Sequence, residues 1–376
     1  MKTFCRMHSP HVRNLCLVMI ASVAFFAIHA QAAGSIKVVA STVPSNGDVN
    51  PYGVAVVPTT TGMLVQGNIL ISNFNNSANL QGTGTTIVQI SPAGTMSLFA
   101  QIDGTKLPGP CIGGIGLTTA LVALKSGWVV VGSLPTTDGT SATAQAGCLL
   151  VLDSKGNVAE TFFGSLINGP WDMAASDQGS HASLFYTNVL NGTVAGNGNV
   201  VHGGTIVRMD LNIPSKSMPS IQAMTVIGSG FAEKTDPGAL VIGPTGVYLG
   251  MSGNGHDGND NQPVLYVADS INNRIAAIPD AMTRTTSDGT GMTITSGGSF
   301  NDPLGLTVLP NGNIVTANGD DGFAIETTPS GQQIAKALLD KSGDPPGAGA
   351  LFGLAFVAGQ GLYYVDDATN TLNLAH

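Results

Sequence analysis

Short apolar runs alternate with polar turns along most of this chain. The clearest example is "LYVADSINNRIAAIP" (265–279), in which apolar and polar residues alternate, a polar turn follows, and the alternation resumes. Period-two alternation on both sides of a turn predicts a β-hairpin. Similar hairpins recur along the chain, and repeats of roughly 40–60 residues are typical of propeller blades.

The recurring unit contains four types of strand, named a to d here in chain order. Type a is a heptad in which four of six copies have Pro in the second place and five have Gly in the fourth. Its copies span 50–56, 113–119, 169–175, 243–249, 302–308 and 350–356. Type b spans 67–73, 127–133, 183–189, 264–270, 312–318 and 361–367. Type c spans 86–92, 148–154, 205–211, 274–280, 323–329 and 371–376, and type d spans 95–102, 157–164, 221–228, 291–298 and 332–339.

The last unit has no strand d, whereas a spare strand at 35–42 precedes the first strand a. If the spare strand completes the last sheet, the ring closes and leaves no exposed edge. The pattern therefore predicts an all-β fold, a six-bladed β-propeller of four-stranded antiparallel blades whose last blade is closed by the N-terminal strand. The composition agrees, because 50 of 376 residues are Gly and only 10% are charged.

The first 32 residues have the form of a secretory signal peptide. Basic residues at 2, 6 and 13 precede an apolar stretch at 15–28, and Ala30-Gln31-Ala32 forms a small-residue cleavage site before Ala33. No later apolar run approaches the length of a membrane span. We therefore expect a signal peptide at 1–32, a single propeller domain at 33–376, no membrane span, a secreted or periplasmic location, and a monomer.

The net charge limits the possible partners, and the cysteine content predicts a disulfide. The leader holds three of the 14 basic and none of the 23 acidic residues, so the mature chain carries a net charge of −12. That balance argues against nucleic acid as a partner. Two cysteines remain after cleavage, Cys111 and Cys148, and an oxidising compartment favours a disulfide between them.

The hairpin "LYVADSINNRI" resembles the NHL repeat, and the whole repeat pattern resembles the secreted six-bladed group of NHL, gluconolactonase-type and strictosidine-synthase-like propellers. The resemblance to gluconolactonases implies a divalent metal at the mouth of the central channel, held by oxygen ligands at the starts of the inner strands. Here the third places of the heptads hold none of those ligands; they are Tyr52, Ile115, Trp171, Thr245, Leu304 and Phe352. We therefore predict no metal and no cofactor, although polar residues beside the mouth leave a rearranged site open; these are Asn50, Asn168, Asp172, Asn301 and Asp302.

The same third places suggest a binding site. Tyr52, Trp171 and Phe352 would form an aromatic floor to the mouth. Polar residues would rim it, namely Asn50, Asn168, Thr245 and Asp302. Small-molecule sites are usually built from an apolar surface with a few polar groups. The alternative is that these rings simply plug the channel.

The other motifs in the sequence do not indicate a metal site or a catalytic site. The stretch "GNGHDGNDNQ" (253–262) resembles the start of a calcium loop, but Gln262 replaces the expected Gly and no Glu closes it. We interpret it as a solvated insertion. The four mature histidines are scattered and no nucleophile elbow is present, so we assign no catalytic residues.

The b–c connections are long in the first three blades and short in the last three, which indicates a binding surface on one half of one face. The sequence thus favours a secreted, NHL-like propeller that binds a small molecule or a protein partner on its loop-rich face, without catalysis. The alternative is a gluconolactonase-like hydrolase or related lyase with its active site at the channel mouth.

Overall fold

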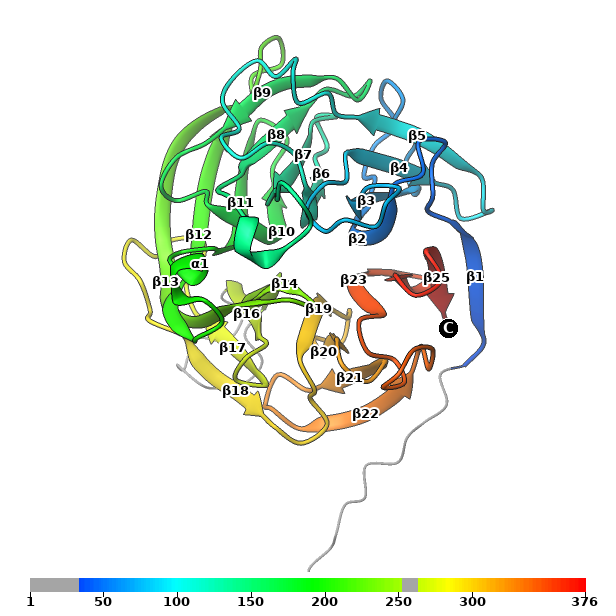
Figure 1. Cartoon of the computed structure of the whole chain (residues 1–376), viewed down its shortest axis with the longest axis vertical. Coiled ribbons are helices and arrows are strands. Elements are labelled where there is room, and N and C mark those ends of the chain that lie inside the picture. The colour runs from blue at the N-terminus through cyan, green and yellow to red at the C-terminus, as the bar shows by residue number, and fades with distance from the viewer. Residues whose placement is uncertain (1–33, 252–262) are drawn as a thin grey trace, which may run out of the picture.

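Six antiparallel sheets form a ring around a central axis (Figure 1). The structure is a computed structural model, and it describes residues 34–251 and 263–376. The leader at 1–32 and the calcium-loop-like stretch at 253–262 lie outside the described residues. Within the described part of the chain, no helix has the length and apolar character needed to cross a membrane.

Each of the first three blades runs outward from the axis in the order a, b, c, d. The first consists of β2 (Val49–Val56), β3 (Ile69–Asn75), β4 (Thr86–Ile90) and β5 (Met96–Gln101). The second consists of β6 (Leu117–Ala123), β7 (Val129–Ser133), β8 (Cys148–Leu152) and β9 (Val158–Phe162). The third consists of β10 (Gly169–Asp177), β11 (His181–Val189), β12 (Val201–Asn212) and β13 (Ser220–Asp236), followed by a short fifth strand, β14 (Leu240–Ile242). Two short helices, η1 (Ser141–Thr143) and α1 (Thr193–Gly196), lie in the b–c connections of the second and third blades.

The remaining blades follow the same order. The fourth consists of β15 (Pro244–Met251), β16 (Pro263–Asp269), β17 (Arg274–Ile278) and β18 (Met292–Ser296). The fifth consists of β19 (Pro303–Val308), β20 (Ile314–Asn318), β21 (Phe323–Thr327) and β22 (Gln333–Leu338). The sixth contains β23 (Leu351–Val357), β24 (Gly361–Asp366) and β25 (Thr371–Ala375), and its outer strand is β1 (Ile36–Ser41).

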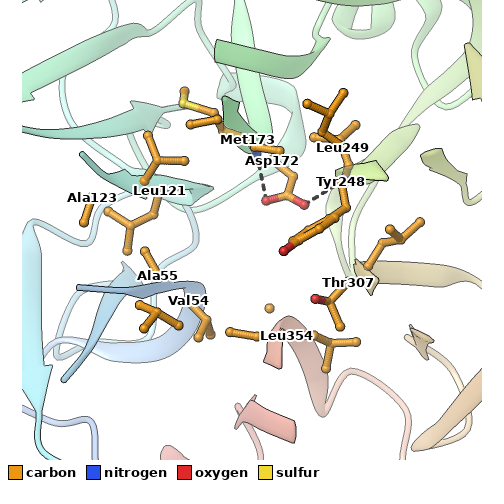
Figure 2. Close-up of a pocket in the computed structure, with 18 of the residues that line it drawn as sticks. Val54, Ala55, Leu121, Ala123, Asp172, Met173, Tyr248, Leu249, Thr307 and Leu354 are labelled. Atoms are coloured by element: carbon orange, nitrogen blue, oxygen red, sulfur yellow. Dashed lines mark hydrogen bonds between the residues drawn. The ribbon is translucent and has the colours of Figure 1, made fainter. Parts of the chain in front are cut away.

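The N-terminal strand closes the ring as predicted. β1 is antiparallel to β25, with Ile36 opposite Ala375 and Ser41 opposite Thr371. The six inner strands contact one another in the order β2, β6, β10, β15, β19, β23 and back to β2. They surround a central channel (Figure 2).

Every inner strand has a bulge near its start. In β2, Pro51 is opposite Asn73 and Val54 is opposite Ile71, so Tyr52 and Gly53 together face a single residue of β3. Such bulges bend the strand and aim side chains away from the regular ladder. Because the bulge falls at the third and fourth places of the heptad, these places face the axis.

Glycine in the fourth place lets neighbouring inner strands approach closely. A Cβ atom on Gly305 would collide with the carbonyl oxygen of Phe352, and one on Gly353 would collide with that of Tyr52. The close approach explains the predicted glycine pattern in terms of backbone contact between blades.

The second blade departs from the predicted register. We expected strand a at 113–119, but β6 begins at Leu117, and the pairing of Leu121 with Val131 shifts the heptad by four residues. Thr119, not Ile115, therefore occupies the third place and Ala120 the fourth. The segment before the strand is held by the predicted disulfide between Cys111 and Cys148, whose Cα atoms are 5.1 Å apart.

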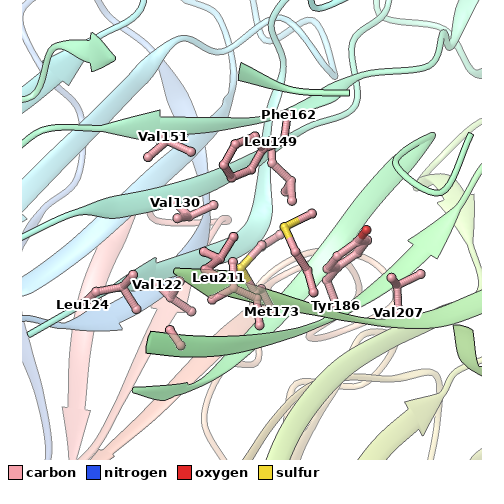
Figure 3. Close-up of a cluster of buried hydrophobic side chains, with 14 of the residues drawn as sticks. Val122, Leu124, Val130, Leu149, Val151, Phe162, Met173, Tyr186, Val207 and Leu211 are labelled. Carbon is pink, nitrogen blue, oxygen red and sulfur yellow. The ribbon is translucent and has the colours of Figure 1, made fainter. Parts of the chain in front are cut away.

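The hydrophobic core lies between the blades. Between the second and third blades, side chains from facing sheets interdigitate (Figure 3); they include Val122, Val130, Leu149, Met173, Tyr186 and Val207. All six are buried.

The NHL-like hairpin is stabilised by an ion pair within the fourth blade. Arg274 Nε lies 2.6 Å from Asp269 Oδ2, and Asp269 is fully buried. The guanidinium also donates to Thr293 Oγ1 and to the carbonyl oxygen of Thr290, both on the outer side of the same blade.

Candidate functional site: the mouth and the central channel

The aromatic residues predicted at the mouth converge on the axis. The Tyr52 ring is stacked between Phe74, at 4.5 Å between centroids, and Phe352, at 4.0 Å. Trp171 meets Tyr52 and Phe74 edge-on, at 5.9 and 5.6 Å. Phe74 lies near the end of strand b, a position that the heptad pattern did not single out.

A hairpin covers this aromatic cluster. β13 extends beyond the other outer strands and pairs with β14, with Lys234 opposite Ile242 and Asp236 opposite Leu240. Leu240 and Val241, at its tip, are buried against Tyr52 and Trp171. The cavity that remains measures only about 30 Å³, which is close to the volume of one water molecule. The mouth on the loop-rich face is therefore closed by packing.

The remaining predicted residues fall into two groups. Thr245 and Asp302 line the same small cavity, and Thr245 Oγ1 is also bonded to the carbonyl oxygen of Gly243 at 3.0 Å. Asn50 and Asn168 do not line it. The Asn168 side chain donates to Asn191 Oδ1 at 2.7 Å, whereas the buried Oδ1 of Asn50 has no hydrogen-bond partner among the described residues.

Acidic groups at the mouth are held in surroundings that disfavour their charge. Burial, together with the nearby Asp320 and Asp236 carboxylates, raises the pKa of Asp302 to about 7. Burial likewise raises the pKa of Asp367 to about 7, with a further contribution from Asp366. In the part of the chain that the structure describes, no three His, Cys, Asp or Glu residues are grouped so that they could hold a metal ion.

A larger cavity occupies the channel itself, on the other side of the aromatic cluster. It measures about 370 Å³ and is lined by all six inner strands. Most of the described lining is Val, Ala and Leu, and four of its side chains add polar groups: Asp172, Ser176, Tyr248 and Thr307. Figure 2 shows Asp172 and Tyr248 projecting into the channel from β10 and β15. Tyr248 is 40% exposed, so this region is in contact with solvent.

Among the described residues that line this cavity, Asp172 carries the one carboxylate. Its Oδ1 accepts from the backbone N–H of Met173 at 2.8 Å, and its Oδ2 accepts from Val247 N–H in the next blade at 3.0 Å. Burial raises the pKa of this carboxyl group to about 7, and the backbone hydrogen bonds only partly oppose the increase. Asp172 also lines the small cavity at the mouth, beside which the sequence analysis placed it, whereas Tyr248 was not singled out. The signal for Asp172 was present, since it stands in a place that is otherwise Gly in four blades.

The comparisons with known proteins bear on the fold. No protein-family model matches this sequence, and no curated protein matches it in sequence. Among solved structures, a candidate gluconolactonase matches with a TM-score of 0.54 and 16% identity over 95% of this chain and 96% of that one. A gluconolactonase from Xanthomonas campestris matches with a TM-score of 0.51 and 13% identity, over 92% and 98% of the two chains. A calcium-binding protein, regucalcin, from Agrobacterium tumefaciens matches with a TM-score of 0.51 and 12% identity, over 92% and 95%. The fold is therefore that of the gluconolactonase-like six-bladed propellers, as expected.

Proposed function

We propose that this protein binds a small, mainly apolar molecule in its central channel and that it does so without catalysis. One observation supports this most directly: a cavity of about 370 Å³ that is walled by apolar side chains and contains a few polar groups. Ligand pockets commonly have volumes of about 300–1,000 Å³ and this kind of lining.

The proposal moves the site from the loop-rich face, where the sequence suggested it, to the channel. At the mouth, Trp171 is only 4% exposed and the residual cavity of about 30 Å³ is too small for an organic ligand. In the channel, Tyr248 is accessible, and the described residues that line the cavity all belong to the inner strands. Binding at the mouth by the predicted aromatic and polar residues would require the hairpin of β13 and β14 to open.

The proposed location is the periplasm or the cell exterior, and the proposed state is a monomer. The leader-like first 32 residues and the disulfide between Cys111 and Cys148 both support an oxidising compartment.

A second candidate is a hydrolase related to gluconolactonases, or a related lyase, acting at the mouth. It is supported by the fold of the matching structures and by Asp302 and Asp367, two carboxyl groups with a pKa of about 7 that could exchange protons near neutral pH. The closed hairpin is the reason that we place it second. Turnover of a lactone, measured with and without added calcium, would favour this candidate.

The channel proposal can be tested by a thermal-shift screen of aromatic compounds, sugars, lactones and metal ions. A compound that binds only the folded state raises the melting temperature. The screen is then repeated with Ala123→Phe, which adds a ring to the channel lining. The matched control is Ala159→Phe on the outer strand β9, where the same ring lies away from the axis.

We expect at least one apolar compound to stabilise the unmodified protein and the Ala159→Phe variant, but not the Ala123→Phe variant. If every stabilising compound acts equally on both variants, the site is not in the channel. If no organic compound stabilises the protein at all, the binding function itself is wrong.

A further inference from the structure

We propose that the ligand of the channel is an organic cation, an apolar body that carries a positively charged nitrogen placed between Asp172 and Tyr248. This inference rests on the proposed function, because it names the class of molecule that the channel would bind.

Asp172 has unused capacity to accept hydrogen bonds in an apolar cavity. Both of its carboxylate oxygens accept a backbone hydrogen bond, but each retains a further lone pair. Among the described residues, no Lys, Arg or His lines the channel and none forms an ion pair with this carboxylate. A carboxylate in an apolar cavity is costly unless it is paired. A cationic ligand would supply the missing partner.

Closure of the ring does not need a carboxylate at this place. The fourth place of the heptad is Gly53, Gly246, Gly305 and Gly353 in four blades and Ala120 in a fifth. Five blades therefore pack around the axis with almost no side chain here. In the third blade, Asp172 adds a charge to the channel wall instead.

Tyr248 lies on the inner strand next to that of Asp172. The Asp172 carboxylate bonds to Val247, the residue directly before Tyr248, and both side chains project into the channel (Figure 2). An aromatic face attracts cations, and the attraction strengthens when the site is shielded from water. A carboxylate and an aromatic ring on neighbouring inner strands, surrounded by apolar walls, together form a site for a positively charged nitrogen.

The lining also discriminates against other ligands. An anionic molecule would meet the Asp172 carboxylate without any basic side chain among the residues that line the cavity. A strongly polar neutral molecule, such as a sugar, would leave most of its hydroxyl groups facing Val, Ala and Leu. Both kinds of ligand lose hydration without compensation.

The test uses a matched pair of probes, choline and its uncharged carbon isostere 3,3-dimethylbutan-1-ol. They have almost the same shape and differ in the charge of one atom. Affinity for each is measured by calorimetry or by competition at a pH above 7, where Asp172 is mostly ionised. We expect choline to bind at least about tenfold more tightly than the isostere, because a shielded cation–aromatic contact alone contributes about that much.

In Asp172→Asn, the ratio of the two affinities should fall by at least about threefold, since the contribution of the carboxylate charge is lost while the Tyr248 ring keeps its own. Tyr248→Leu should reduce the ratio partly and gives a second measurement if the first variant folds poorly. Asp177→Asn, which removes the same charge at the end of β10, outside the channel lining, should leave the ratio unchanged.

The outcomes separate the two proposals. Equal binding of both probes to the unmodified protein would overturn the inference about charge while supporting the channel as a binding site. Loss of the ratio in Asp177→Asn as well would also overturn it, because the preference would then reflect the overall negative charge. If neither probe binds and the apolar compounds of the thermal-shift screen also fail, the proposed function falls together with the inference.

Discussion

Replacing Trp171 with Ala should destabilise the protein strongly, because the indole is part of the packing that closes the mouth. Trp171 is only 4% exposed and contacts Tyr52 and Phe74 edge-on. An aromatic side chain of this kind buries about 150–250 Å². At about 25 cal/mol per Å², that area corresponds to roughly 4–6 kcal/mol, which is an upper bound because the unfolded chain already buries part of it. Substitutions of buried Trp by Ala cost about 3–5 kcal/mol, and we expect a loss of about 4 kcal/mol.

The measurement is equilibrium unfolding in urea, and the chain offers a matched control. It contains only one other tryptophan, Trp128, which is partly buried and lies beside an outer groove. Trp128→Ala should therefore cost less, about 1–2 kcal/mol. In Trp128→Phe, the remaining fluorescence comes from Trp171 and should be shielded from a soluble quencher.

These measurements distinguish two roles for Trp171, as part of the packing that closes the mouth or as an open surface for a ligand. If Trp171 is an open ligand platform, its removal should cost less than about 1.5 kcal/mol, within the range of ordinary substitutions, and its fluorescence should be readily quenched. Either finding would refute the closed mouth and return the binding site to the loop-rich face. A large loss of stability combined with unchanged binding in the channel would support the arrangement described above.

Three further predictions concern single interactions. Cys111→Ser should lower the free energy of unfolding by about 2–4 kcal/mol, measured under non-reducing conditions, because the bond to Cys148 closes a loop across a separation of 37 residues; an unchanged value would mean that the bond does not form. Arg274→Met should lower the free energy of unfolding by about 3–5 kcal/mol in the same urea assay, because it leaves the fully buried Asp269 without its ion-pair partner. The loss should be smaller if Asp269 is changed to Asn in the same molecule. As the pH rises from about 4 to about 7, the free energy of unfolding should fall less steeply in Asp172→Asn than in the unmodified protein. The reason is that the unfolded carboxyl group ionises near its ordinary pKa of 3.8, whereas burial raises the pKa of the folded one to about 7. Parallel pH profiles of the two proteins would show that the channel leaves this pKa unperturbed.

The blades were predictable from the sequence because their pattern is local and repeated. Short apolar runs bounded by polar turns identify strands that are buried between neighbouring sheets, and alternation identifies those with one exposed face. The missing strand after β25 and the spare strand β1 then specified the closure. Each of these features depends on periodicity within one unit, and the prediction is stronger because the same pattern occurs in six copies.

The register of β6 was mispredicted because its heptad lacks the local markers of the others. "GGIGLTT" has Gly in the fourth place, but the strand that faces the axis is "LTTALVA", with Ala120 there instead. Ala is small enough to permit the close approach, so the glycine signal is absent from the true heptad. Gly116, the fourth residue of the predicted heptad, instead packs against the backbone of Gly82 in the first blade. The pattern of one blade does not reveal such a contact between blades.

The site was less predictable than the fold because it depends on which end of the channel is filled. The heptads predicted the aromatic residues that lie at the axis, but not that β13 extends past its neighbours and packs Leu240 and Val241 against Tyr52 and Trp171. That contact joins the end of the third blade to the starts of the first and third inner strands, so no local pattern encodes it. Beyond the filled mouth, the larger cavity lies further along the same inner strands, where the described lining is mostly apolar and Asp172 is the exception. A residue that interrupts a repeat is thus more informative about the candidate site than the residues that conform to it.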